Sequence, residues 1–301
     1  MQKTNKIIHL VEVGPRDGLQ NELRILSTED KLTYIEMLVS AGIKNLEVTS
    51  FVRPEKIPQM SDAKELSLGL KKKEGVHYYA LIPNEKGFEE GLKAGIQAMA
   101  FFTATSEEFN KRNINASIAE SFERMAPLVK KAQAQRIHTR GYISTVFGCP
   151  YVGNISIEQV KKVVGEFAEL GVDEISLGDT IGVATPQQVK KIIKELSSVV
   201  DKKKLAMHFH DTRGMALTNI YASLDEGIEI FDSSSAGLGG CPYAKSATGN
   251  VATEEVVYLL HSLGYTTGID LEKLMLASRF VLQKLQKKTS SKYLKALHAD
   301  L

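Results

Sequence analysis

The sequence predicts a single α/β domain, a (β/α)8 TIM barrel with an additional C-terminal helical segment. Short β-branched, apolar runs alternate eight times with longer amphipathic runs. No linker, repeat or low-complexity stretch interrupts the 301 residues. The first apolar run leads into Gly14-Pro15-Arg16-Asp17-Gly18. That segment is not the glycine-rich dinucleotide loop expected there in a doubly wound sheet, which is the competing fold.

Eight strands are expected, each as a short apolar run, at Ile7–Val13, Asn45–Phe51, His77–Ile82, Ala98–Thr103, Thr139–Val146, Glu174–Gly178, Leu205–His210 and Ile228–Ser233. Amphipathic runs rich in Lys, Glu, Leu and Ala predict helices between and after them, at Thr28–Ala41, Ser61–Lys73, Glu85–Ala94, Ile118–Gln135, Ile157–Leu170, Pro186–Val199, Met215–Asp225, Thr253–Leu263 and Leu271–Lys287. Helices that alternate with strands in this way indicate parallel pairing through right-handed crossovers.

Residues typical of helix ends support these boundaries. Good N-caps precede three of the helices, at Ser27 or Thr28, Ser156 and Thr185. Glycine follows four of the helices, at Gly42, Gly171, Gly227 and Gly264. We therefore divide the chain into a catalytic barrel, residues 1–265, which includes a mobile loop around Cys241, and a helical extension packed on it, residues 266–301. The tail beyond Lys287 is expected to be loosely held.

The composition excludes several classes of function. Lys and Arg number 38 and Asp and Glu 36, a formal charge of +2, so nothing draws the chain to nucleic acid or to an anionic membrane. No apolar run approaches the roughly 18 residues that span a bilayer. Neither a signal peptide nor a peroxisomal address is expected. With two cysteines, no disulfide framework is predicted, and a cytoplasmic location is expected.

Ionisable residues gather at the ends of the predicted strands, where a barrel carries its active site. The strongest pattern is His208-Phe209-His210, because residues two apart on a strand face the same side. Two hydrogen-bonded histidines in a polar interior explain that pattern about as well as a shared cation does. Asp17 and Asn250, near other strand ends, favour the cation. Such a mixed nitrogen and oxygen set suits Mg²⁺, Mn²⁺ or Zn²⁺.

Three other charged residues each have two interpretations. Arg16 is either a salt-bridge partner of its acidic neighbour or a cation aimed at a developing enolate or carboxylate oxygen. Glu47 would hold the guanidinium group in both cases. Asp179 is explained as well by hydrogen bonding at the barrel rim as by catalysis.

The two cysteines are assigned different roles. Cys241 follows Gly237-Leu238-Gly239-Gly240, a segment that permits tight turns and a mobile loop. Its thiol is therefore a candidate general acid/base or nucleophile. Cys149 has a similar setting after the fifth strand, but no titratable residue lies near it in the sequence. A structural role is favoured there.

Several long motifs are specific enough to identify a family. The opening motif runs from Val11 to Glu22, and a second runs from Ser234 to Ala244 and continues at Gly249–Glu254. Shorter stretches cover the rest of the chain, at Thr49–Val52, Pro58–Met60, Arg112–Asn115, Ser176–Gly182 and His208–Thr212. Together they resemble 3-hydroxy-3-methylglutaryl-CoA lyase (HMG-CoA lyase). More widely, the chain resembles the TIM-barrel metallolyases, which include Claisen-condensing synthases and pyruvate-transferring carboxylases.

The resemblance implies cleavage of (S)-HMG-CoA to acetyl-CoA and acetoacetate with a divalent cation, Mg²⁺ or Mn²⁺. It also implies an acyl-CoA substrate, a homodimer, and a place in leucine degradation and ketone-body formation. The family's metal ligands match Asp17, His208, His210 and Asn250. The tail of this chain lacks the cysteine on which redox control of some relatives depends, so that control is not expected here.

The remaining site residues are also assigned by resemblance. Arg16 matches the arginine that stabilises the acetyl-CoA enolate, and Cys241 matches the cysteine that moves protons. Glu47 and Asp179 match residues that support the site. We expect Asp179, or His208 where it is not purely a ligand, to take the hydroxyl proton, and Cys241 to protonate the enolate carbon.

Two other functions remain open at this point. The first is a related lyase for another 3-hydroxy-acyl-CoA, such as a 3-hydroxy-3-isohexenylglutaryl-CoA, or a Claisen-type synthase. Synthases usually carry a long C-terminal region for which this chain has no room. The second is a non-catalytic, metal-stabilised barrel. A barrel without activity could lose the charged residues and the cysteine without harm to its core, and this chain retains them all.

Overall fold

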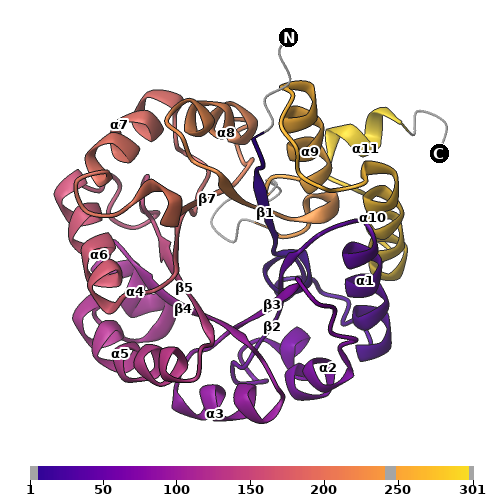
Figure 1. The fold of residues 1–301 in the computed structure, drawn as a ribbon, viewed down its shortest axis with the longest axis horizontal. Helices are drawn as coiled ribbons and strands as arrows, with labels where there is room; N and C mark the ends of the chain where they lie inside the picture. Colours follow the sequence, from indigo (N-terminus) through magenta and orange to yellow (C-terminus); the bar gives the residue numbers. More distant parts are fainter. Residues whose placement is uncertain (1–5, 241–248, 298–301) are drawn as a thin grey trace.

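Residues 6–240 and 249–297 are described by a computed structural model, in which eight parallel strands form a closed barrel (Figure 1). The strands follow one another around the barrel in chain order, and β8 pairs back onto β1. They are β1 His9–Glu12, β2 Asn45–Ser50, β3 His77–Leu81, β4 Ala98–Ala104, β5 His138–Ser144, β6 Glu174–Asp179, β7 Leu205–Phe209 and β8 Ile230–Ser233. The predicted (β/α)8 barrel is confirmed, and every strand end lies within two residues of its predicted position.

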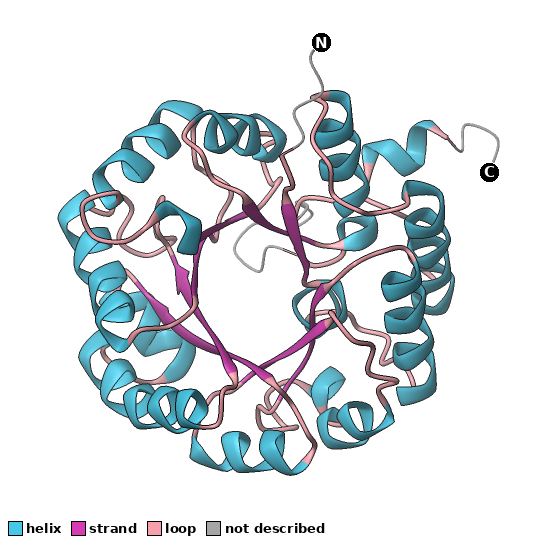
Figure 2. Cartoon of the chain, viewed as in Figure 1, coloured by secondary structure: helices cyan, strands magenta, loops and turns pink. Residues whose placement is uncertain are grey.

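Helices surround the barrel as an outer ring (Figure 2). They are α1 Thr28–Ser40, α2 Ala63–Gly69, α3 Glu85–Lys93, α4 Glu107–Ile114, α5 Ile118–Ala134, α6 Ile157–Leu170, α7 Pro186–Leu196, α8 Ala216–Asp225, α9 Thr253–Ser262, α10 Leu271–Leu285 and α11 Lys292–Ala296. The apolar faces of the ring helices and of the strands form one continuous core. In the described part of the chain, no helix is long and apolar enough to cross a membrane.

The predicted capping residues and closing glycines are confirmed. The side chains of Ser27, Ser156 and Thr185 each accept a hydrogen bond from the backbone N–H three residues further on. The four glycines at the helix C-termini all have positive φ. Two helices are shorter than predicted. Helix α2 runs only from Ala63 to Gly69, and α7 ends at Leu196 instead of Val199.

Two helices were not predicted from the sequence. Helix α4 has only two buried residues, Phe109 and Asn110, so it lacks the apolar stripe that marks a helix. The expectation of a loose tail was wrong up to residue 297. Helix α11 buries Leu294, and Ser290 Oγ donates to the carbonyl oxygen of Gly237 at 2.8 Å. Thr289 and Lys292 add further hydrogen bonds to the barrel.

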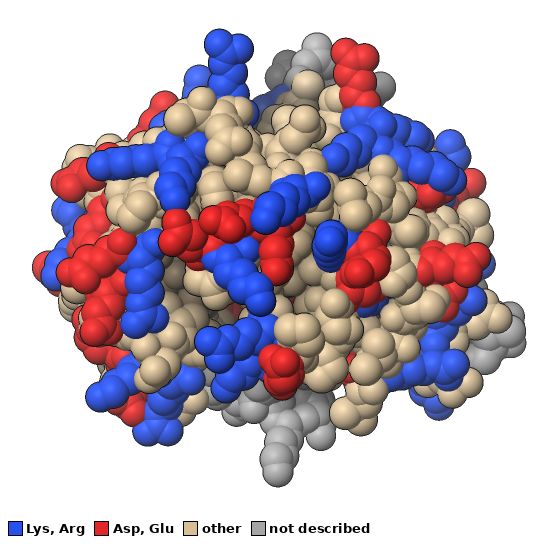
Figure 3. All heavy atoms as spheres, turned by 90° about the horizontal axis from the view of Figure 1, so that it is seen from below, with Lys and Arg blue, Asp and Glu red and all other residues tan. Residues whose placement is uncertain are grey.

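The division of the chain at residue 265 stays a prediction. Helix α10 packs against α1, and the segment before it joins the barrel through a parallel bridge between Ile7 and Thr266. On the side of the molecule in Figure 3, acidic and basic side chains are interspersed, in keeping with the small net charge.

The interior of the barrel is polar at its centre, where aliphatic layers are usual. Arg140 on β5 is fully buried and forms ion pairs with Glu174 on β6 and Asp232 on β8. Its Nη1 atom also donates to the hydroxyl of Tyr142 at 2.7 Å. A buried guanidinium group needs such partners, since an unpaired charge in the interior is strongly unfavourable. This network reaches the site described next.

Candidate active site and metal centre

The chain after β1 forms one turn of π-helix, Gly14–Gly18, which carries Arg16 and Asp17. Turns of this kind are common at functional sites. Glycine is needed at position 18 because of a close approach. A Cβ atom there would lie 2.7 Å from Ser234 Oγ and 2.9 Å from Leu238 Cβ. The tight turn therefore depends on the loop after β8 and places the two charged side chains at the C-terminal end of the barrel.

Asp17, His208 and His210 come together as predicted, with one ligand atom of each within 4.8 Å of the others. Asn250 joins them, since its Nδ2 donates to Asp17 Oδ2 at 2.7 Å and to the carbonyl oxygen of Leu238 at 3.2 Å. Within the described ranges, His210 Nδ1 and Asn250 Oδ1 are buried and have no hydrogen-bond partner. Buried polar atoms are rarely left without a partner, so these two fit a cation that they would ligate.

The ionisation of these groups also suits a cation. Burial alone would raise the pKa of Asp17, but the charges of Arg16 and His208 lower it, so the carboxylate is ionised. Burial lowers the pKa of His210 to about 4, with a further contribution from His208, so its ring is neutral at pH 7. Burial also favours neutral His208, but its hydrogen bond with Asp232 raises the pKa. Ligation requires a lone pair, which a neutral imidazole provides.

Arg16 is held in one orientation by two carboxylates. Its Nε and Nη2 atoms lie 2.7 and 2.5 Å from Glu47 Oε2, and its Nη1 atom donates to Asp17 Oδ1 at 2.8 Å. Glu47 has no exposed side-chain surface, and the Arg16 side chain is only 9% exposed. The two interpretations of Arg16 are therefore compatible, because a fixed guanidinium group beside the metal ligands is both an ion-pair partner and a positive charge directed at the site.

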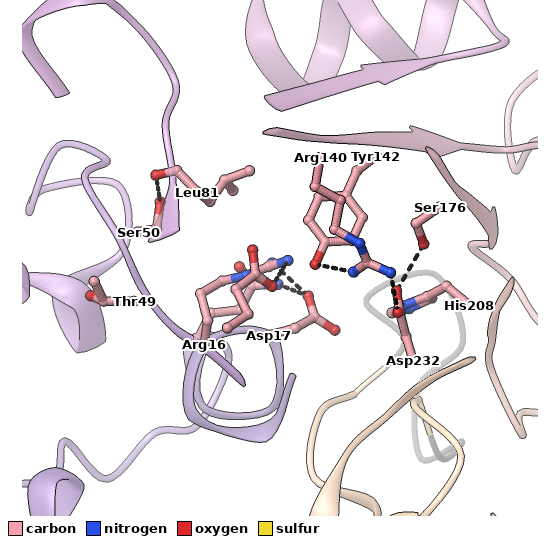
Figure 4. A network of polar contacts seen from close by, with 12 residues as sticks. Arg16, Asp17, Thr49, Ser50, Leu81, Arg140, Tyr142, Ser176, His208 and Asp232 are labelled. Atoms are coloured by element: carbon pink, nitrogen blue, oxygen red, sulfur yellow. Dashed lines mark hydrogen bonds and ion pairs between the residues drawn. The ribbon is translucent and has the colours of Figure 1, made fainter. Parts of the chain in front are cut away.

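Asp232, Arg140 and Ser176 are neighbours of the site that the sequence analysis missed (Figure 4). Asp232 Oδ2 lies 3.2 Å from His208 Nδ1 and accepts a hydrogen bond from Ser176 Oγ at 2.8 Å. Asp232 Oδ1 accepts from Arg140 Nη2 at 2.5 Å. Burial opposes ionisation, but the charge of Arg140 lowers the pKa of Asp232 to about 2. An acidic residue inside a buried strand was the available signal.

Asp179 lies at the barrel rim, where both of its oxygens hold the loop that follows β6. Oδ1 accepts from the backbone N–H of Val183 at 2.9 Å, and Oδ2 accepts from Ala184 at 3.1 Å. Burial raises its pKa to about 6 despite these bonds. A carboxyl group with such a pKa can exchange protons near neutrality, so the predicted role as a base and the rim role both stay open.

Of the two cysteines, only Cys149 is among the described residues. Cys241 lies outside the described residues, so its role stays a prediction. Cys149 is 2% exposed and packs with Ala104 and Phe109. Its Sγ lies 3.1 Å from Ser106 Oγ. These contacts agree with a structural role for Cys149.

Residues 7–281 match the model of the HMGL-like family. The chain belongs to the HMGL-like family. A 3-hydroxy-3-isohexenylglutaryl-CoA/hydroxymethylglutaryl-CoA lyase of Pseudomonas aeruginosa is 50% identical over 98% of both chains. The mitochondrial hydroxymethylglutaryl-CoA lyase of Homo sapiens is 50% identical over 97% of this chain and 90% of its own. The crystal structure of a hydroxymethylglutaryl-CoA lyase from P. aeruginosa superposes with a TM-score of 0.96, at 49% identity and with complete coverage of both chains.

Proposed function

We propose that this HMGL-like protein is a lyase that cleaves (S)-HMG-CoA to acetyl-CoA and acetoacetate with the help of a divalent cation. The observation that carries the proposal is the cluster of Asp17, His208 and His210 directly beside the buried guanidinium group of Arg16. Support also comes from the names of relatives that are 50% identical over almost the whole chain. Neither a condensing synthase nor a non-catalytic barrel has comparable support.

Four residues would hold the cation: Asp17, His208, His210 and Asn250. A bound divalent cation would acidify the tertiary hydroxyl group of the substrate and orient it. The hydrogen bonds of these residues determine which of their atoms can bind the cation. The Nδ2 atom of Asn250 is occupied by Asp17 and Leu238, which leaves its Oδ1 atom for ligation.

Arg16 would stabilise the negative charge that develops as the carbon–carbon bond breaks. When C2–C3 of HMG-CoA breaks, its electron pair moves onto the acetyl-CoA half as an enolate, and the former hydroxyl carbon becomes the keto group of acetoacetate. Because the Arg16 guanidinium is fixed by Glu47 before the reaction, no reorganisation is needed when the charge appears.

Two protons move in this reaction. A base takes the hydroxyl proton, and we assign that role to Asp179, or to His208 where it is not purely a ligand. An acid then protonates the enolate carbon, and we assign that role to Cys241. The pKa of about 6 for Asp179 supports the first assignment. The second rests on the resemblance alone.

Mg²⁺ or Mn²⁺ is the proposed cation, because the ligands combine imidazole nitrogen with carboxylate and amide oxygen and include no thiolate. A homodimer, a cytoplasmic location and a role in leucine degradation and ketone-body formation also belong to the proposal. These rest on the family resemblance and on the composition.

The proposal is tested by turnover of defined thioesters. The purified protein is stripped with a chelator, reloaded with Mg²⁺, Mn²⁺ or Zn²⁺, and incubated with HMG-CoA and with 3-hydroxy-3-isohexenylglutaryl-CoA, which the name of the P. aeruginosa relative includes. Mass spectrometry should detect acetyl-CoA and acetoacetate from HMG-CoA. Absence of both products with every cation would refute the proposed activity. Preference for the isohexenyl thioester would instead assign the related lyase.

A further inference from the structure

Asp232 is the one carboxylate that contacts His208 Nδ1 among the described residues, and both of its oxygen atoms have hydrogen-bond partners. Its Oδ1 atom accepts from Arg140 Nη2, and its Oδ2 atom is bonded to both Ser176 Oγ and His208 Nδ1. Asp232 has no exposed side-chain surface. The carboxylate is thus fixed in position from two sides, by β5 and β6, before it meets the imidazole.

An ionised carboxylate can only accept hydrogen bonds. The hydrogen atom between Asp232 and His208 therefore belongs to Nδ1 of the imidazole. A neutral imidazole carries a single N–H, so the lone pair of His208 resides on Nε2. The nitrogen that the site would use as a ligand is thereby determined for this residue.

His210 has a different environment. Its Nδ1 atom is buried and has no hydrogen-bond partner within the described ranges. Asp232 therefore has no counterpart at the Nδ1 atom of this second ring.

We propose that Asp232 sets the tautomer of His208 before any cation binds, so that this ring presents Nε2 to the site. Asp232 is a positioning residue, because it acts on the cation only through the imidazole. This inference rests on the proposed metal site. The rings of His208 and His210 lie 5.3 Å apart between centroids, so the nitrogen that His208 presents decides whether the two rings can share one cation.

The Arg140 contact makes the inference testable by a small change. In Asp232→Asn, Arg140 still needs an acceptor, so the amide oxygen turns toward Arg140 and the amide NH₂ toward Ser176 and His208. His208 Nδ1 must then accept a hydrogen bond, and its proton moves to Nε2. The side chain keeps its shape, but the lone pair is removed from the site. A serine-protease triad loses its correct histidine tautomer in the same way on Asp→Asn substitution.

Long-range ¹H–¹⁵N NMR spectra of the ¹⁵N-histidine-labelled full chain report the tautomers directly. They are recorded at about pH 9, where imidazoles are neutral, before and after addition of Mg²⁺. His208→Gln and His210→Gln assign the two rings. We expect the Nδ1–H form for His208 in the metal-free protein. The Nε2–H form for His208 would overturn the inference, whether or not Asp232→Asn folds.

Binding of Mn²⁺ provides the second measurement. Asp232→Asn should bind Mn²⁺ about 10- to 100-fold more weakly, and His208 should change to the Nε2–H form. Ser176→Ala is the matched control, because it also removes a hydrogen bond from Asp232 Oδ2 but leaves the carboxylate, so the His208 tautomer should be unchanged. Wild-type affinity in Asp232→Asn would overturn the inference. The predicted His208 tautomer in a wild-type protein that binds no Mn²⁺ would support it and refute the proposed metal site.

Discussion

Replacement of Arg16 by glutamine should lower both the free energy of unfolding and kcat, for two different reasons. Arg16 contacts Glu47 Oε2 through its Nε and Nη2 atoms, and Glu47 Oε1 has no partner among the described residues. Arg16→Gln therefore leaves a buried carboxylate without its neighbouring cation. Loss of one partner of a buried ion pair costs about 3–5 kcal/mol in the free energy of unfolding. Loss of a charge that stabilises a transition state lowers kcat by about 10²- to 10³-fold.

A double substitution separates the two effects. Arg16→Gln with Glu47→Gln removes both charges, and two amide side chains can hydrogen-bond to each other. Most of the stability should return, because no charge is then left unpaired. The kcat value should stay low, because no cation remains at the site. Urea unfolding and steady-state kinetics on the four proteins of the cycle provide the data. Recovery of kcat together with stability would show that Arg16 is only an ion-pair partner.

Three further predictions concern other groups. His208→Ala and His210→Ala should each weaken Mn²⁺ binding in calorimetry while circular dichroism stays unchanged. Wild-type affinity in both variants would contradict the ligand assignment. Cys241→Ser should lower kcat by about two to four decades, and the matched control Cys149→Ser should not. Burial raises the pKa of Glu12 from 4.5 to about 7, so the folded protein holds a proton there that the unfolded chain releases. The free energy of unfolding should therefore fall as pH rises from 4.5 to 7, and less so in Glu12→Gln; identical pH profiles would refute this.

The sequence predicts the fold well because the signals for it are local. Each strand is a short apolar run, and each long helix has an apolar face together with a side-chain cap at its start or a glycine after its end. Helix α4 lacks the apolar face and the closing glycine. Its N-cap is Ser106, whose side chain accepts from the backbone N–H of Phe109. Its fold depends on the burial of Phe109 against Cys149, which is distant in sequence. Periodicity within a helix cannot predict such a contact.

In the site, too, residues that are close in the sequence are predictable, and contacts between distant residues are not. His208 and His210 form a pattern within three residues, so their common face is readable from the sequence. Asp232 and Arg140 are 92 positions apart and meet only because β5 and β8 face each other across the closed barrel. Each of the two is recognisable in the sequence as a charged residue within a strand. That they form an ion pair with each other can be known only from the arrangement of the strands in the barrel.

The polar interior and the site depend on each other physically. The guanidinium groups of Arg16 and Arg140 lie 5.6 and 4.8 Å from the ring centroid of Tyr142, so two buried positive charges are placed on one aromatic residue. Their mutual repulsion is tolerable only while each keeps its carboxylates. One of those carboxylates is Asp17, and another orients His208. A barrel with an aliphatic interior would pack more simply, but it would lose the groups that orient the ligands. Substitutions in this interior should therefore alter metal affinity before they unfold the barrel.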